Sequence, residues 1–242
     1  MRRAVEFSDG RHIADIPSSP SPPRASVHAV SILTMRHPAA AARGLTSAVA
    51  SPRLLAQIAG AYYLIIFVAA PSGAATATPL RMLLTMACDT AVALIFYVLF
   101  KPVSRKVALA ALVFRLIFVG MMTFAALDYF GALDFLQSAG SADTFNTIYR
   151  LALVPFGVHC LLIGYLIYRS EFLTRFLGVL LALGGLAYVA FVSPSLAQHF
   201  YPYILIPGVV GEGVLTLWLL IRGVDSERWP VAAAANRGEG AQ

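Results

Sequence analysis

The chain has 242 residues, of which 59% are hydrophobic and only 12% are charged. A soluble domain of this length would carry charge on about a quarter of its residues, so the composition excludes an ordinary soluble protein and indicates a membrane protein. The net charge of +6 does not indicate nucleic-acid binding, because the basic residues are spread over the N-terminal region and short loops and form no basic face interleaved with aromatic side chains.

The first 50 residues differ in composition from the rest of the chain. They are rich in Ser, Pro, Ala and Arg and contain no long apolar run, so they cannot bury a core. Arg2-Arg3 is similar to a twin-arginine signal, but no hydrophobic region follows within reach. We therefore predict a disordered tail over residues 1–50, most of which a start at Met35 would remove. The Ala-rich end of the chain predicts a second disordered tail over residues 225–242.

Six apolar stretches follow between the two tails, and each is close to the roughly 20 residues that a helix needs to cross a bilayer. They comprise residues 54–70, 81–100, 107–127, 147–168, 173–192 and 203–221. Their backbones must be helical, because lipid offers no partner for free N–H and C=O groups. The predicted fold is an all-α membrane domain over residues 51–224, a bundle of about six transmembrane helices.

The connections between these stretches predict the orientation. Basic residues flank every second connection and both ends of the domain: Arg36, Arg43, Arg53, Lys101, Arg105, Lys106, Arg169, Arg175, Arg222 and Arg228. The positive-inside rule places these segments, and so both termini, in the cytoplasm (N-in/C-in), and six spans satisfy that parity. The outer connection 128–146 carries Asp128, Asp134 and Asp143, which match no calcium-binding pattern and are interpreted as a solvated loop.

Four apolar stretches each carry one ionisable residue near the middle: Asp89, Arg115, His159 and Glu212. Counted from the nearest cytoplasmic cation, all four lie about 13–18 Å into the membrane at 1.5 Å per residue. A central charge on a transmembrane helix costs about 2.5–3.5 kcal/mol on insertion scales. We therefore predict that the four side chains face the interior of the bundle, near one plane, and meet each other there.

The charges of these four residues do not balance. Two carboxylates and one guanidinium leave one carboxylate over, so either His159 is protonated or one acid keeps its proton. Two interpretations stay open. The polar centre is a proton-responsive site in a small carrier or sensor of a small solute, or it is a network that only fixes helix packing in a membrane interaction or scaffold protein.

Glycines lie close to two of these residues. Gly157 precedes His159, and Gly208, Gly211 and Gly213 surround Glu212. Small residues allow membrane helices to approach closely, so these positions are predicted to be helix contacts.

Motifs of known enzyme classes are missing from the sequence. There is no His-Glu-x-x-His, Gly-x-Ser-x-Gly, phosphate-binding Gly-Lys-Ser/Thr loop or Rossmann glycine set. Cys88 and Cys160 lie inside apolar stretches and are interpreted as small core residues, without zinc-site spacing. We predict neither a metal nor a cofactor and favour a non-enzymatic role over an enzyme that uses the central acids.

Several motifs in these stretches resemble one membrane-protein family. They are the run from Ser51 to Tyr63, Cys88-Asp89, Phe114-Arg115-Leu116, the run from His159 to Ser170 and the run from Leu215 to Val224. In this order and spacing they are similar to the bacterial family catalogued as domain of unknown function 4386, over about residues 51–224. The resemblance implies a multi-pass protein of the bacterial cytoplasmic (inner) membrane without an assigned activity. The partners expected are the lipid bilayer and a small solute or proton, with the protein as a monomer or an oligomer.

Overall fold

The computed structural model describes residues 51–70, 74–132 and 140–229, which belong to one unit, Ser47–Gln242. Both predicted tails lie largely outside these ranges. The described residues form helices joined by turns, without strands. The long helices are α2 (Pro52–Ala69), α3 (Pro79–Phe100), α4 (Arg105–Tyr129), α5 (Ala142–Arg169), α6 (Arg175–Val189) and α8 (Ile206–Ile221). The short elements are η1 (Ala74–Thr76), η3 (Ala190–Val192), α7 (Pro194–Phe200) and η4 (Tyr203–Leu205).

Three of the long helices begin at a hydroxyl side chain that caps their free N–H groups. Ser51 accepts a hydrogen bond from Leu54 N, Thr78 from Arg81 N and Ser141 from Thr144 N. In α2 and α3 the cap is followed by proline, which lacks an N–H and has the backbone angle of a first helical turn. The start of each of these helices is therefore determined by the local sequence.

The prediction of six membrane-spanning helices is confirmed for the described residues. The spans are Pro52–Ala69, Pro79–Phe100, Arg105–Tyr129, Ala142–Arg169, Arg175–Val192 and Tyr203–Ile221, the last two including η3 and η4. The fourth span begins five residues earlier than predicted, because Ser141 caps a polar first turn ahead of the apolar run.

The connection predicted as a solvated loop over residues 128–146 is only partly a loop. Asp128 is buried in the last turn of α4, and Asp143 lies in the first turn of α5. Asp134 lies outside the described residues. The prediction for Asp128 was wrong, because α4 and α5 continue beyond their apolar runs and bring this carboxylate into the helical region.

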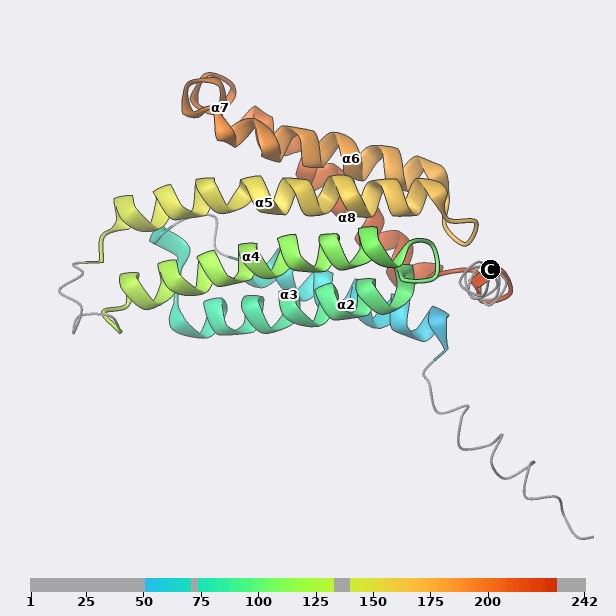
Figure 1. The fold of residues 1–242 in the computed structure, drawn as a ribbon. Coiled ribbons are helices and arrows are strands. Elements are labelled where there is room, and N and C mark those ends of the chain that lie inside the picture. The colour runs from blue at the N-terminus through green and yellow to red at the C-terminus, as the bar shows by residue number, and fades with distance from the viewer. Residues whose placement is uncertain (1–50, 71–73, 133–139, 230–242) are drawn as a thin grey trace, which may run out of the picture. The chain divides into compact units, whose positions relative to one another are not determined.

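The six long helices, seen from the side in Figure 1, form a closed ring by their contacts. Helices α2 to α6 each pack against the next one in the chain, α6 packs against α8, and α8 packs against α2. This last contact brings together the start and the end of the domain, where the backbone of Arg53 lies next to Gly223. The first and last spans therefore close the ring, and the interior is reached by side chains from all six.

The surface of this ring is apolar and its interior holds charge. Val68, Leu83 and Ile221 are 76%, 71% and 72% exposed, whereas Asp89, Arg115 and Glu212 are 2%, 1% and 8% exposed. A soluble protein of this kind would present large apolar patches to water. In a bilayer the same surface is solvated by lipid, so the arrangement fits an integral membrane protein.

Residues 225–229, which were predicted to belong to a disordered tail, have a defined structure. The backbone N–H of Asp225 donates to Phe172 O (3.1 Å), and the indole of Trp229 donates to Leu99 O (2.9 Å). These bonds fix residues 225–229 to the end of α3 and to the α5–α6 connection. The indole of Trp229 gains both apolar contacts and a carbonyl partner. These contacts stabilise the segment although the residues around Trp229 have low hydrophobicity.

Candidate functional site

An ion pair between Arg115 of α4 and Asp89 of α3 lies inside the ring. Arg115 also donates from Nη1 to the hydroxyl of Tyr63 on α2, at 2.9 Å. Its guanidinium lies 4.6 Å from the ring centre of Phe156 and 5.2 Å from that of Tyr63. The cation is therefore compensated by a carboxylate, a hydroxyl and two aromatic faces, and only its Nε atom has no hydrogen-bond partner.

Glu212 of α8 has a different environment. One of its carboxylate oxygens accepts a hydrogen bond from the hydroxyl of Tyr188 on α6, at 2.8 Å. Over the described part of the chain the structure records no ion pair to Glu212. Asp89 and Glu212, which look alike in the sequence, thus differ: one carboxylate is neutralised by a cation, and the other is held by a neutral hydroxyl.

The third partner in this arrangement is a glycine. Tyr188 lies against Gly208 of α8, and a Cβ atom on Gly208 would collide with the ring and hydroxyl of Tyr188. The missing side chain at Gly208 therefore makes room for the tyrosine to reach Glu212, one helical turn further along α8. Gly208 is thus a helix contact, as predicted, and its missing side chain lets Tyr188 reach Glu212.

We expect Gly208→Ala to displace Tyr188 and destabilise the protein by about 1–3 kcal/mol, as overpacking of a filled interior does. Tyr188→Phe should then cost less in the Gly208→Ala background than alone, because its hydrogen bond is already lost. A double-mutant cycle of unfolding free energies in detergent measures this. Gly213→Ala is the matched control on the same helix, because its Cβ would come no closer than 4.0 Å to Phe67. Additive effects in the cycle would contradict the assignment.

His159 of α5 is buried but does not join the two carboxylates. Its Nδ1 lies 2.8 Å from Ala111 O, which can only accept, so Nδ1 carries a proton. Its Nε2 is buried without a partner, and the ring stacks on Phe156. Within the described ranges the structure records no hydrogen bond or ion pair from His159 to either acid. The sequence-based alternative in which His159 balances the extra carboxylate is not the arrangement found here.

A cavity of about 180 Å³ lies between these side chains and is lined by all six long helices. Its polar wall consists of Thr85, Asp89, Arg115, Tyr149, Tyr188 and Glu212. The remaining wall is apolar and consists of Ile66, Phe67, Ala70, Met82, Met86, Phe118, Met122, Leu153, Phe156 and Val209. Three of the four predicted residues, Asp89, Arg115 and Glu212, meet at this cavity, while His159 is not among its lining residues.

Two further cavities continue from the central one toward the end of the bundle that carries α7. The first, of about 200 Å³, shares Tyr149 and Leu153 with the central cavity. The second, of about 340 Å³, shares Arg150, Phe191 and Tyr201 with the first. Neighbouring cavities thus share walls along a line that leads from α7 to the polar centre.

The opposite end of the bundle interior is filled by aromatic rings. Tyr63, Phe96, Phe100 and Phe172 follow each other with ring centres 5.7–5.8 Å apart. All four are buried. These rings therefore separate the polar centre from this end of the bundle.

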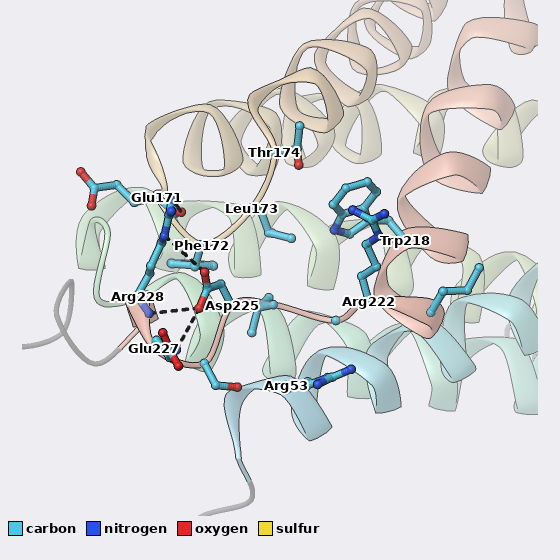
Figure 2. A pocket seen from close by; sticks show the side chains of 14 residues that line it. Arg53, Glu171, Phe172, Leu173, Thr174, Trp218, Arg222, Asp225, Glu227 and Arg228 are labelled. Carbon is cyan, nitrogen blue, oxygen red and sulfur yellow. Dashed lines mark hydrogen bonds and ion pairs between the residues drawn. The ribbon is translucent and has the colours of Figure 1, made fainter.

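A larger hollow of about 710 Å³ lies on the surface at that end, between the start of α2, the α5–α6 connection and the end of α8 (Figure 2). Three arginines and three acids line it, and in Figure 2 Glu171, Asp225 and Glu227 gather beside Arg228, apart from Arg53 and Arg222. The pair Arg228–Asp225 is 3.2 Å apart and well exposed, so it contributes little. The charges of these lining residues thus sum to zero.

Sequence reasoning missed the two tyrosines of the site. Tyr63 carries a usable signal, because it lies well inside an apolar run, whereas tyrosines in membrane proteins are enriched at the interfaces. Tyr188 lies near the end of its span, where an interfacial tyrosine is expected, and so gives no such signal. No group of three His, Cys, Asp or Glu side chains that could hold a metal occurs in the described residues.

A closed ring of six apolar helices with charged side chains inside defines an integral, multi-pass α-helical membrane protein. The family model described as a domain of unknown function, DUF4386, matches residues 72–223, and the chain belongs to this family, as its motifs indicated. A protein of the archaeon Archaeoglobus fulgidus, named "Uncharacterized protein", is 28% identical over 138 residues, which are 56% of this chain and 76% of that relative. No solved structure matches the chain.

Proposed function

We propose that the bundle is a small carrier or sensor in which Glu212 takes up and releases a proton inside the central cavity. The observation that carries this proposal is the contrast between the two acids. Asp89 is neutralised by Arg115, whereas Glu212 lines the same cavity with only a hydroxyl as its recorded side-chain partner. Glu212 is neutral when it binds a proton and carries an uncompensated negative charge when it loses the proton. Such a group can couple the binding of a proton to the binding of a second ligand.

Among the described residues, no second cation lies beside Glu212 at the cavity. The buried ionisable side chains around the cavity are Tyr63 on α2, Asp89 on α3, Arg115 on α4, Tyr149, His159 and Cys160 on α5, and Tyr188 on α6. Arg115 is already paired, and the proton on His159 faces Ala111 O. Protonation of Glu212 is thus the simplest way to bring the polar centre to zero charge.

We also propose that the protein lies in the bacterial cytoplasmic membrane with both termini inside. The distribution of charge supports this orientation. The basic residues at one end of the bundle are all exposed: Arg53, Lys101, Arg105, Lys106, Arg169, Arg175 and Arg222. Exposed cations beside short loops are retained on the cytoplasmic side. In this orientation the line of cavities leads from the polar centre toward the outer side, and the stacked rings of Tyr63, Phe96, Phe100 and Phe172 lie toward the cytoplasm.

A second candidate is a non-catalytic membrane scaffold or interaction protein, acting as a monomer or an oligomer. The contacts of Arg115 favour it, because they join α2, α3 and α4 through Tyr63 and Asp89. A network of this kind specifies how helices pack whether or not any ligand binds. The two candidates assign different roles to Glu212, which allows them to be separated.

The experiment is Glu212→Gln, with exposed Glu227→Gln as the matched control. Infrared spectra at several pH values should show a protonated carboxylic acid band that disappears in Glu212→Gln and persists in Glu227→Gln. The unfolding temperature of Glu212→Gln in detergent should equal or exceed that of the parent, because an amide keeps the Tyr188 partner without a buried charge. A marked loss of stability would favour the scaffold, and an unchanged infrared band would overturn the proposal.

A further inference from the structure

We infer that the central cavity binds a small hydrophobic amine, with its ammonium group on Glu212 and its apolar body against the surrounding methionine and aromatic side chains. This inference rests on the proposed function, in which Glu212 is the proton-binding group, and it names the class of ligand that would exchange with the proton. It is carried by three features of the cavity: its charge, its lining and its position beside the lipid-facing surface.

The charge of the cavity selects a monovalent cation. Asp89 and Arg115 neutralise each other, so deprotonated Glu212 leaves one negative charge. Tyr188 donates to one oxygen of that carboxylate, and within the described ranges the structure records no hydrogen bond to the other. An ammonium group carries three donors and one positive charge, which match this carboxylate. A carboxylate or phosphate ligand would be repelled, and a calcium ion would require six or more oxygen ligands.

The lining selects an apolar body. Met82, Met86, Met122, Leu153 and Val209 form much of the wall. Methionine side chains are flexible and polarizable, so they adapt to ligands of different shape. The rings of Tyr149 and Tyr188 also line the cavity and can stabilise a cation by cation–π contact. The volume of about 180 Å³ corresponds to roughly six water molecules at 30 Å³ each, which suits an amine of about one ring.

The position of the cavity gives such an amine a route from the bilayer. Helices α2 and α8 approach closely at Gly60, whose Cβ would come within 2.8 Å of Leu220 N. Further along, at Gly213, nothing but the tip of Phe67 comes within 4.0 Å. Phe67 and Val209 line the cavity and are also 39% and 52% exposed on the outside of the ring. The wall between α2 and α8 is thus thin at the cavity, and an amine dissolved in lipid reaches Glu212 there.

The test uses benzylamine and its uncharged isostere benzyl alcohol, titrated calorimetrically into the full-length protein in detergent. Benzylamine should bind and raise the unfolding temperature, whereas benzyl alcohol should do neither beyond its effect on the detergent alone. Glu212→Gln should weaken benzylamine binding by about thirtyfold or more, as loss of a buried charge partner does. Lowering the pH should also weaken binding, because protons compete for the same carboxylate.

A second variant keeps the carboxylate and fills the cavity. Val209→Trp should abolish benzylamine binding while the infrared band of Glu212 remains, and Gly120→Leu, whose Cβ faces open space, should change neither. Equal binding of benzyl alcohol, or benzylamine binding that survives Glu212→Gln, would overturn the amine assignment. If the infrared band titrates but benzylamine does not bind, the inference fails and the proposed proton site stands. If no band titrates, both fail.

Discussion

Asp89→Asn should destabilise the protein by about 3–5 kcal/mol, the range measured when one partner of a buried ion pair is removed. Arg115 is 1% exposed and lies between the rings of Tyr63 and Phe156. Without the carboxylate of Asp89 its recorded partners are a hydroxyl and two aromatic faces, and Glu212 at the same cavity makes no recorded ion pair with it. The measurement is the unfolding free energy in mixed detergent micelles, titrated with a denaturing detergent.

The control for this prediction is the double variant Asp89→Leu/Arg115→Met. Replacing both members of a buried pair by apolar side chains is often neutral or stabilising, so the double variant should recover most of the lost stability. Asp143→Asn removes an exposed carboxylate and should stay within about 0.5 kcal/mol of the parent. Parent-like stability of Asp89→Asn alone would contradict the ion pair as the main compensation of Arg115.

The number and approximate limits of the spans could be predicted because lipid imposes a minimum apolar length and a helical backbone. The same reasoning singled out Asp89, Arg115 and Glu212, since a charge inside an apolar run is costly and must face a partner or a cavity. These residues meet at one cavity. What the sequence could not provide is the rotation of each helix. Both lipid-facing and core-facing positions are apolar, so hydrophobic periodicity does not distinguish the faces of a membrane helix.

The difference between the two acids shows this limit. Glu212 reaches the hydroxyl of Tyr188 only because α8 packs between α6 and α2 and because Gly208 leaves space for the ring. His159 instead meets the backbone of Ala111, a partner that every residue offers and no sequence pattern marks. The glycines that were predicted to be helix contacts also differ from one another in their surroundings. Gly157 and Gly211 lie against neighbouring backbones, while Gly213 does not.

The second large effect is expected at the contact between α5 and α6, which two glycine pairs hold together. A Cβ on Gly164 would come within 2.7 Å of Gly178 O, and one on Gly178 within 2.5 Å of Gly164 O. Gly157 and Gly185 repeat this relation one heptad away, at 2.6 and 2.7 Å. The obstacles are backbone atoms of the facing helix, which cannot rotate aside as a side chain can. Any Cβ here forces the two helices apart along their whole contact.

We therefore expect Gly164→Ala to cost about 1–3 kcal/mol and Gly164→Leu to cost more, with little folded protein recovered. Gly120 of α4 is the matched control, because nothing lies within 4 Å of its Cβ. Gly120→Ala should be neutral or stabilising by about 0.5–1 kcal/mol through reduced backbone entropy, and Gly120→Leu should be tolerated. Thermal unfolding in detergent and the yield of monodisperse protein report both series. If Gly164→Leu behaved like Gly120→Leu, α5 and α6 would have to separate without loss of stability, and close backbone contact could not be what holds the ring together at this side.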